Sequence, residues 1–241
     1  MQPTLSLPAT ERRASDWLAG ALRVLFVVLV AYPVVLLWLG RQVRHRPRLP
    51  LHGPAIVAAN HNSHLDLLVL LTLFPLGRIA RVQPAAAADY FCRTWWLRWF
   101  STRVIGIIPV QRGSLHQPGA PDPLAACYQA LAAGKVLVLF PEGTRGQPEH
   151  LAELKAGIWY LARQFPQAPV VPVYLHGLGR SMPKGTLIPV PLFVRVAIGQ
   201  PLRWQADKAA FISTLRKRLC CLKASLHCPE EENDLPPSQD A

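Results

Sequence analysis

Apolar and polar positions follow two patterns along the chain. One long apolar stretch lies near the N-terminus, and after residue 50 short apolar runs of strand type alternate with stretches of helical spacing. The expected strands cover residues 55–59, 79–82, 104–110, 135–140, 169–175 and 193–198. The expected helices cover residues 65–74, 89–100, 122–133, 150–164 and 206–226. Strands that alternate with helices predict an α/β layered domain with a largely parallel sheet.

The N-terminal apolar stretch reads LAGALRVLFVVLVAYPVVLLWLG from Leu18. At 1.5 Å per residue it is long enough to cross a bilayer as a helix. Arg23 would then extend its side chain to the interface, and Pro33 would kink the helix or fold it into a re-entrant pair. A signal peptide and a buried core helix are the alternatives. We expect a membrane anchor over residues 18–46.

Charge and domain limits refine this arrangement. Four arginines follow the apolar stretch, namely Arg41, Arg44, Arg46 and Arg48. By the positive-inside rule they place the folded domain on the cytoplasmic face of the membrane. We expect an N-terminal tail over residues 1–17, the domain over residues 47–228, and an acidic, disordered tail over residues 229–241.

Composition narrows the classes of partner. The chain holds 26 Lys and Arg against 14 Asp and Glu, for a net charge of +12, and 51% of its residues are apolar. A basic, apolar protein suits an anionic membrane surface or an anionic substrate. We find no nucleic-acid-binding motif, so we expect no nucleic-acid partner. The five cysteines match neither a metal knuckle nor a disulfide framework, and we expect reduced thiols.

The stretch NHNSHLD, from Asn60 to Asp66, joins a predicted strand to a predicted helix. A carboxylate such as Asp66, bound to one ring nitrogen of His61, leaves the other nitrogen free to take a proton. No serine or cysteine nucleophile motif accompanies the pair, so the activated hydroxyl would belong to a substrate. Two alternatives stay open: a metal site that includes His64, and a helix cap with solvated histidines.

A second stretch, LFPEGTRG, follows the most apolar predicted strand. Gly143 allows a ligand to approach the backbone, while Thr144 and Arg145 offer a hydroxyl and a guanidinium to a phosphate. Glu142 would accept a hydrogen bond from a glycerol hydroxyl or hold Arg145. In a third stretch, IGIIPVQRG, a strand would bring Arg112 to the same edge of the sheet as a second cation, and the alternative is a solvated arginine in a turn.

Two further stretches matter for the fold and for membrane contact. VVPVYLHG carries Pro172 inside a predicted strand, which indicates an edge strand or a bulge. DYFCRTWWLRWF combines tryptophans with arginines, a composition typical either of a helix at a bilayer interface or of ordinary core aromatics.

In this order, the four motif stretches resemble the PlsC-like lysophospholipid acyltransferase family. Residues 60–66 resemble its NHxxxxD box and residues 140–145 its FPEGTR box, while residues 106–112 resemble a looser second block that ends in an arginine. Residues 154–157 resemble the Lys-x-Gly after the third box, and residues 171–173 the fourth block. The resemblance implies a glycerolipid-acyltransferase-like fold, preceded here by the N-terminal membrane helix.

The resemblance also implies a chemistry. His61 takes the proton of a free glycerol hydroxyl, and Asp66 orients it, with Asn60 and Pro172 in supporting roles. The acceptor head group is expected to contact Arg112, Glu142, Gly143, Thr144, Arg145 and Lys155. The acceptor would be 1-acylglycerol-3-phosphate (lysophosphatidic acid), and the acyl donor acyl-CoA or acyl carrier protein. The product would be phosphatidic acid for phospholipid biosynthesis, made without a metal or an organic cofactor.

Three rival functions remain open at this point. The first is the same acyl transfer to a different acceptor, either another lysophospholipid or a lyso-ornithine lipid. The second is a metal-dependent hydrolase built on His61, His64 and Asp66. The third is a membrane-surface adaptor without enzyme activity.

Overall fold

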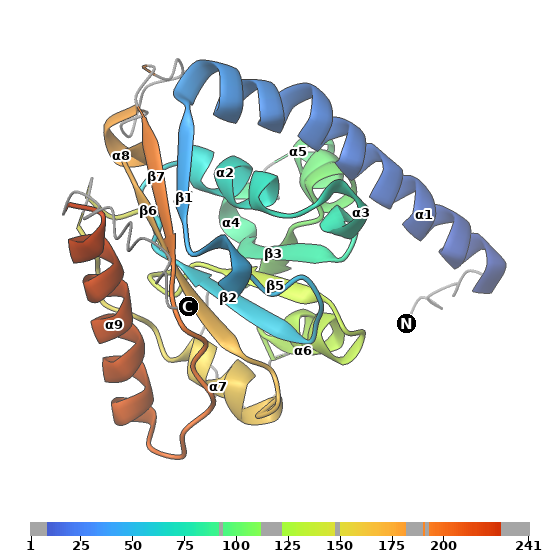
Figure 1. Ribbon diagram of the computed structural model, residues 1–241. Coiled ribbons are helices and arrows are strands. Elements are labelled where there is room, and N and C mark those ends of the chain that lie inside the picture. Colours follow the sequence, from blue (N-terminus) through green and yellow to red (C-terminus); the bar gives the residue numbers. More distant parts are fainter. Residues whose placement is uncertain are drawn as a thin grey trace, which may run out of the picture.

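A computed structural model describes residues 9–91, 94–111, 122–147, 150–181, 190 and 193–227. A mixed sheet lies between two layers of helices, as expected (Figure 1). Among the described residues the sheet has the strand order β1-β7-β6-β2-β5-β3-β4. In that order the strands are Arg41–Arg44, Val194–Ile198, Val170–His176, Ala55–Ala59, Val136–Leu139, Val82–Ala87 and Ile108–Val110. The pairing is parallel except between β6 and β7.

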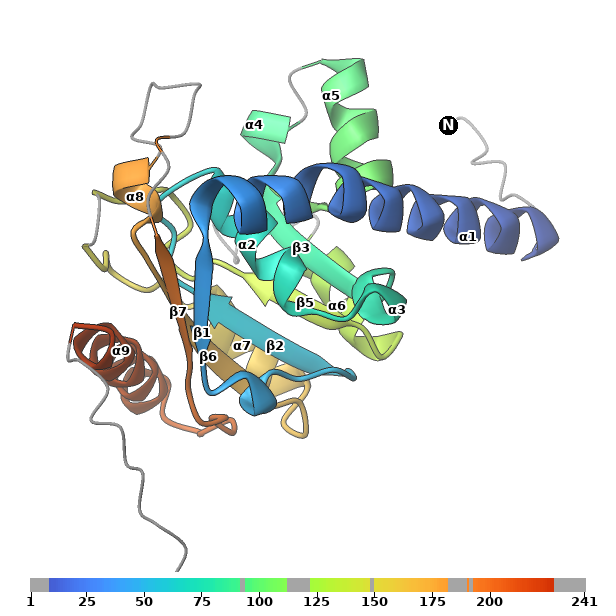
Figure 2. The same ribbon diagram turned by 45° about the horizontal axis from the view of Figure 1, so that its top comes forward.

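Helices cover both faces of the sheet (Figures 1 and 2). On one face lie α1 (Ala9–Phe26), α2 (Leu65–Leu73), α3 (Leu76–Ile79), α4 (Ala88–Phe91) and α5 (Trp95–Trp99). On the other lie α6 (Ala125–Ala132), α7 (Gly157–Gln164) and α9 (Lys208–Ser225), while α8 (Leu178–Ser181) follows β6. Asp207 caps α9, because its side chain accepts the N–H groups of Ala209 and Ala210.

Side-chain alternation along the strands builds two cores. In β2, Val57 and Ala59 belong to the core under α2, whereas Ile56 and Ala58 belong to the core over α6, α7 and α9. All of β2 is buried, as a strand covered on both faces must be. Because β2, β5, β3 and β4 pair in parallel, their carboxyl ends lie at the same edge of the sheet, where α/β proteins place their sites.

The N-terminal helix packs one face against the domain. After α1 it continues as two π-helical turns, η1 (Val27–Ala31) and η2 (Pro33–Leu39), in which Tyr32 N–H donates to Val27 O. The wide turns accommodate Pro33, which has no N–H of its own, and the helix does not fold back there. Every fourth residue of this stretch is buried in the same core as α2, namely Val27, Ala31, Val35 and Leu39. The opposite face stays apolar and exposed, with Leu37 85% exposed.

By length and composition alone, the helix over Trp17–Leu39 is apolar enough to cross a membrane. The end of the expected anchor is part of the sheet, because residues 41–44 form β1 and pair with β7. Two of the arginines counted for membrane orientation bind the last turn of α2. Arg41 donates to Thr72 Oγ1 at 2.6 Å, and Arg46 donates to Leu73 O at 3.3 Å. These side chains are engaged within the domain.

Four predicted elements differ from the structure. The helix expected at residues 89–100 is found as α4 and α5, followed by a π-helical segment, η4 (Phe100–Ile105). The strand expected at residues 104–110 therefore begins only at Ile108, as β4. The strand expected at residues 79–82 lies later, as β3, because Pro84 and a run of alanines lack the β-branched pattern of a strand. The helix expected at residues 150–164 begins only at Gly157, because the preceding residues form a loop that passes under the turn 140–146.

Pro172 lies inside β6, which has neighbours on both sides, so the edge-strand interpretation is wrong. Val173 pairs with Ile198, but Val170 pairs with Leu202, so the register between β6 and β7 slips by one residue. The slip falls where Pro172 lacks an N–H, and Gly199 N–H still donates to Pro172 O at 2.8 Å.

Candidate active site

His61 and Asp66 form a hydrogen-bonded pair at the end of β2. His61 Nδ1 lies 2.9 Å from Asp66 Oδ2, and the same oxygen accepts the N–H groups of Asn62 at 2.6 Å and Ser63 at 2.8 Å. Asp66 is fully buried in the first turn of α2, whereas the His61 side chain is 21% exposed. The carboxylate therefore fixes the ring orientation, and Nε2 is the nitrogen left for a substrate.

Burial raises the pKa of Asp66, and the N–H donors on Oδ2, led by His61, act in the opposite direction. A carboxylate held by three donors has no freedom to rotate away from the imidazole. The pair thus has the geometry of a base and its orienting group.

The FPEGTR turn supports His61 from the other side. Phe140 stacks on the His61 ring with 4.2 Å between ring centroids. Glu142 Oε1 accepts His61 N–H at 2.8 Å, and its Oε2 accepts Ala152 N–H at 2.8 Å. Gly146 N–H donates to His61 O at 3.0 Å. The third box therefore holds both the ring and the backbone of His61.

Glu142 has a different task from the one expected. It is 2% exposed, and backbone N–H groups occupy both carboxylate oxygens, so it neither faces an acceptor hydroxyl nor pairs with Arg145. Burial raises the pKa of Glu142. Glu142 thus holds the backbone of His61 in place.

Gly143, Thr144, Arg145 and Lys155 come together around an opening beside His61. Gly143 has a φ of +72°, and a Cβ there would press on the Lys155 side chain, whose Cδ would lie 3.0 Å away. Lys155 N–H donates to Pro141 O at 2.8 Å, which fixes the loop under the turn. Glycine therefore gives this turn its shape and lets Lys155 lie along it.

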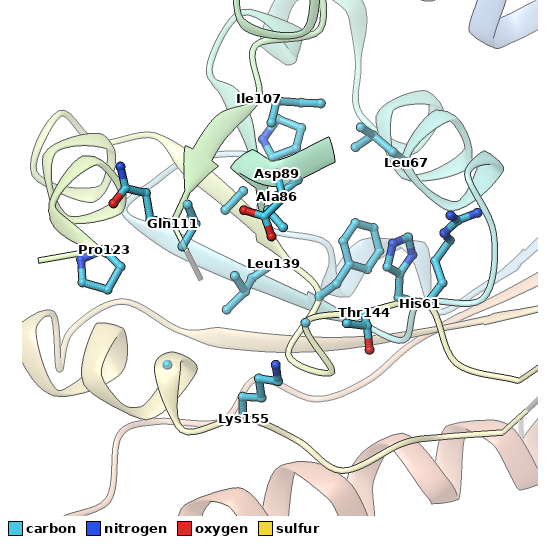
Figure 3. Close-up of a pocket in the computed structure, with 18 of the residues that line it drawn as sticks. His61, Leu67, Ala86, Asp89, Ile107, Gln111, Pro123, Leu139, Thr144 and Lys155 are labelled. Atoms are coloured by element: carbon cyan, nitrogen blue, oxygen red, sulfur yellow. The ribbon is translucent and has the colours of Figure 1, made fainter. Parts of the chain in front are cut away.

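The opening leads into a cavity of about 940 Å³. Figure 3 shows His61 and Thr144 at one end and Gln111 and Pro123 at the other, with Asp89 and Lys155 directed toward the space between. Most of the wall is apolar and comes from α2, β3, β5 and the segment before β4. The apolar lining residues include Leu67, Leu68, Ala85, Ala86, Ile105, Ile107, Leu124 and Leu139. The cavity thus joins a polar end, with cations, to an apolar body.

Asn60 supports the site by extending the sheet. Its side-chain Nδ2 donates to Leu175 O at 2.9 Å, and Leu175 N–H donates to its Oδ1 at 2.7 Å. The amide thereby replaces one more peptide group of the ladder between β2 and β6, just before His61. An asparagine suits this position because it offers both a donor and an acceptor.

Two further predicted residues are Arg112 and His64. Arg112 lies outside the described residues. His64, at the start of α2, lines the same cavity with part of its side chain exposed, and its partial desolvation, Arg145 and His61 lower the pKa of its imidazole. In the part of the chain that the structure describes, no three or more His, Cys, Asp or Glu side chains gather in a metal-binding group. Asp66 Oδ2, the oxygen nearest His61, is already held by three N–H groups.

Sequence reasoning missed Phe140 and Asp89. Phe140 belongs to the FPEGTR box, but nothing in the letters shows that its ring would stack on His61. Asp89 lines the cavity from α4, directly after β3, so placing β3 at residues 82–87 would have revealed it.

Comparisons with known proteins agree with this geometry. The family model Acyltransferase matches residues 40–176, more than half of the chain. A chloroplastic 1-acyl-sn-glycerol-3-phosphate acyltransferase of Arabidopsis thaliana is 30% identical over 133 residues, 55% of this chain and 35% of that protein. The lyso-ornithine lipid O-acyltransferase of Rhizobium meliloti is 30% identical over 149 residues, 61% of this chain and 48% of that protein. The chain thus spans about a third to a half of the length of these relatives.

A solved structure shares the fold. The 1-acyl-sn-glycerophosphate acyltransferase PlsC from Thermotoga maritima superposes with a TM-score of 0.67 at 19% identity, covering 92% of this chain and 86% of that one. The family model and these matches confirm the resemblance found in the motifs. The chain therefore belongs to the acyltransferase family.

Proposed function

We propose that the protein transfers a fatty acyl group from a thioester, acyl-CoA or acyl carrier protein, to the free hydroxyl of 1-acylglycerol-3-phosphate. The product would be phosphatidic acid. The observation that carries the proposal is the His61–Asp66 pair at the polar end of a large apolar cavity. A lipid with a small anionic head and a long tail matches both ends of that cavity.

In the proposed reaction, His61 Nε2 takes the proton of the acceptor hydroxyl as its oxygen attacks the thioester carbonyl. A C–O ester bond forms, the C–S bond breaks, and the proton on His61 passes to the departing thiolate. Asp66 stabilises the imidazolium that exists between the two proton transfers. Phe140 and Glu142 hold the ring and backbone of His61 still during both steps.

Arg145 and Lys155 are the described cations at the cavity, and we assign them to the acceptor phosphate, with Thr144 as a hydroxyl donor. Gly143 keeps the turn open for that head group. Arg112 would add a second guanidinium, and its assignment rests on the motif alone. The reaction as proposed needs no metal or organic cofactor.

A second candidate acceptor is a lyso-ornithine lipid, because a relative at 30% identity has that lipid in its name. An acceptor panel with both lyso-lipids separates the two candidates.

We also propose that the protein works at a membrane, with its active site on the cytoplasmic side. The exposed face of the N-terminal helix and three tryptophans of α5 offer apolar surface on one side of the molecule: Trp95, Trp96 and Trp99 are 82%, 57% and 51% exposed. Phe26 and Phe100 join the two elements, with 5.6 Å between ring centroids. Because its inner face is packed in the domain, the helix suits a position along the membrane surface.

The experiment compares acyl transfer to 1-acylglycerol-3-phosphate by wild type, His61→Ala and His64→Ala, with each donor, in the presence of EDTA. We expect His64→Ala to stay active and His61→Ala to lose about 10²-fold or more of kcat, the range of general base catalysis. Wild-type activity that EDTA abolishes and zinc restores would support the hydrolase alternative. Equal activity in His61→Ala and wild type would contradict the proposed base.

A further inference from the structure

Arg23 is the charged residue inside the apolar N-terminal segment, and it points into the domain. It is 4% exposed, where the sequence had indicated a side chain extended to the membrane interface. Its Nη1 donates to Val82 O at 2.9 Å and to Ala80 O at 3.3 Å. Among the described residues no carboxylate pairs with it, so backbone carbonyls stabilise the charge.

Two glycines make room for this contact. Gly20, one turn before Arg23, brings the helix close to Ala80, since an added Cβ would lie 3.2 Å from the Ala80 Cβ. Gly106 has a φ of +81°, and a Cβ there would overlap the Arg23 guanidinium. Gly106 opens the second motif block, and the structure gives it a steric role toward the helix.

The partners of Arg23 lead directly to the cavity. Val82 begins β3, whose residues from Pro84 to Ala87 line the wall, and Gly106 stands between two lining residues, Ile105 and Ile107. A single side chain on the N-terminal helix therefore ties together the two segments that form the wall opposite His61.

We infer that Arg23 is a positioning residue of the acyl-transfer site, which holds the β3–β4 wall of the cavity through Val82, Ala80 and Gly106. The N-terminal helix is thus an integral part of the site, in addition to any role at the membrane. The kinetic consequence rests on the proposed function, whereas the structural consequence does not. Arg23 touches no reacting group, so its loss acts on substrate affinity more than on the chemical step.

The first measurement is hydrogen exchange of the full-length protein, which is independent of any substrate. In Arg23→Ala, we expect amides of β3 and β4 to exchange about tenfold faster or more, with β2 and β5 little changed. Arg48→Ala is the matched control, because Arg48 also donates to a backbone carbonyl, Ile198 O at 3.3 Å, but far from this wall. Equal exchange in the two variants at β3 and β4 would overturn the inference.

The second measurement is a double-mutant cycle on acyl transfer. Arg23→Ala should raise KM about tenfold with kcat nearly kept, and Gly106→Ala should cost about 10²-fold in kcat/KM through displacement of the wall. In the Arg23→Ala background the Cβ has space, so Gly106→Ala should cost about tenfold less than in wild type. The strain of a positive φ is the same in both backgrounds and cancels.

Losses that simply multiply, or a fall in kcat with KM unchanged, would overturn the positioning role. If Arg23→Ala does not fold, Arg23→Lys replaces it, because a lysine reaches a carbonyl without filling the space above Gly106. Arg23→Lys should reduce the kinetic cost of Gly106→Ala in the same way as Arg23→Ala. If wild type transfers no acyl group to any acceptor, the proposed function fails, and the exchange comparison still decides on the β3–β4 wall.

Discussion

At the scale of single residues, the proposed acyl transfer would depend on how firmly His61 is held. Glu142 accepts two backbone N–H groups and contacts no cavity, so its effect on the reaction passes through His61. In Glu142→Gln the amide NH2 would face one of those N–H groups and leave a buried donor unpaired. We expect a loss of about 1–3 kcal/mol in the free energy of unfolding and a lower kcat, with KM for the acceptor unchanged.

Chemical denaturation and steady-state kinetics check this prediction. Glu153→Gln is the control, because Glu153 is exposed nearby and should tolerate the change. A raised KM in Glu142→Gln with stability kept would show instead that Glu142 contacts the acceptor.

Asp66 makes stability depend on pH in a definite direction. Burial raises the pKa of Asp66 in the folded protein, so the folded state binds this proton more tightly than the unfolded chain does. The stabilisation from the bound proton is complete below the unfolded pKa and is lost as pH rises through the folded pKa. Asp66→Asn removes that contribution. At pH values just above the ordinary range of carboxyl pKa values, the free energy of unfolding of Asp66→Asn should therefore vary less with pH than that of wild type.

Denaturant titrations at a series of pH values measure the difference. An unchanged slope would mean that the N–H donors on Oδ2 outweigh burial. In acyl transfer, Asp66→Asn should lose about 10²-fold or more of kcat, because the imidazole loses its orienting charge.

The contact between His61 and Asp66 could be predicted from the sequence because it is local. His61 and Asp66 are five residues apart at a strand-to-helix junction, and local spacing fixes their contact. The roles of Glu142 and Phe140 depend on residues about 80 positions away, brought near by the pairing of β2 and β5. No local pattern encodes which way a carboxylate turns after such a fold forms.

At the scale of elements, the end of β2 is the critical junction. Asn60 continues the β2–β6 ladder with a side-chain amide after the backbone has turned away. Asn60→Ala would leave the buried N–H and C=O of Leu175 without these partners. We expect the free energy of unfolding to fall by about 2 kcal/mol or more, together with lower activity.

Thermal and denaturant unfolding test this prediction, with Asn60→Asp as the comparison, because a protonated carboxyl offers an acceptor and one O–H donor, whereas an ionised carboxylate offers acceptors alone. The aspartate variant should therefore lie between alanine and wild type when its carboxyl is protonated. Wild-type stability in Asn60→Ala would show that the ladder ends at Ala59.

Elements with strong apolar patterns, such as β2, β5 and α2, could be predicted almost to the residue. β3 was misplaced because alanines and a proline carry little strand signal, although its neighbours β5 and β4 hold it in the sheet. β1 was hidden among arginines, whose side chains reach into the domain. Tertiary pairing decides both cases.

At the scale of the whole molecule, the N-terminal helix joins two environments. Its inner face belongs to the core above α2, and its outer face is apolar and exposed. Hydropathy alone predicted a membrane anchor, because a window of residues cannot distinguish a face that packs on protein from one that contacts lipid.

Val35 and Leu37 test this two-faced arrangement, because they are two residues apart and 0% and 85% exposed. Val35→Glu would place a charge in the core, and we expect it to cost about 3 kcal/mol or more of unfolding free energy. Leu37→Glu should leave stability in detergent unchanged but weaken binding to vesicles that contain anionic lipid. Calorimetry and vesicle sedimentation measure the two effects. A helix that crossed the bilayer apart from the domain would expose both positions to lipid, so both variants would lose vesicle binding and neither would destabilise the domain.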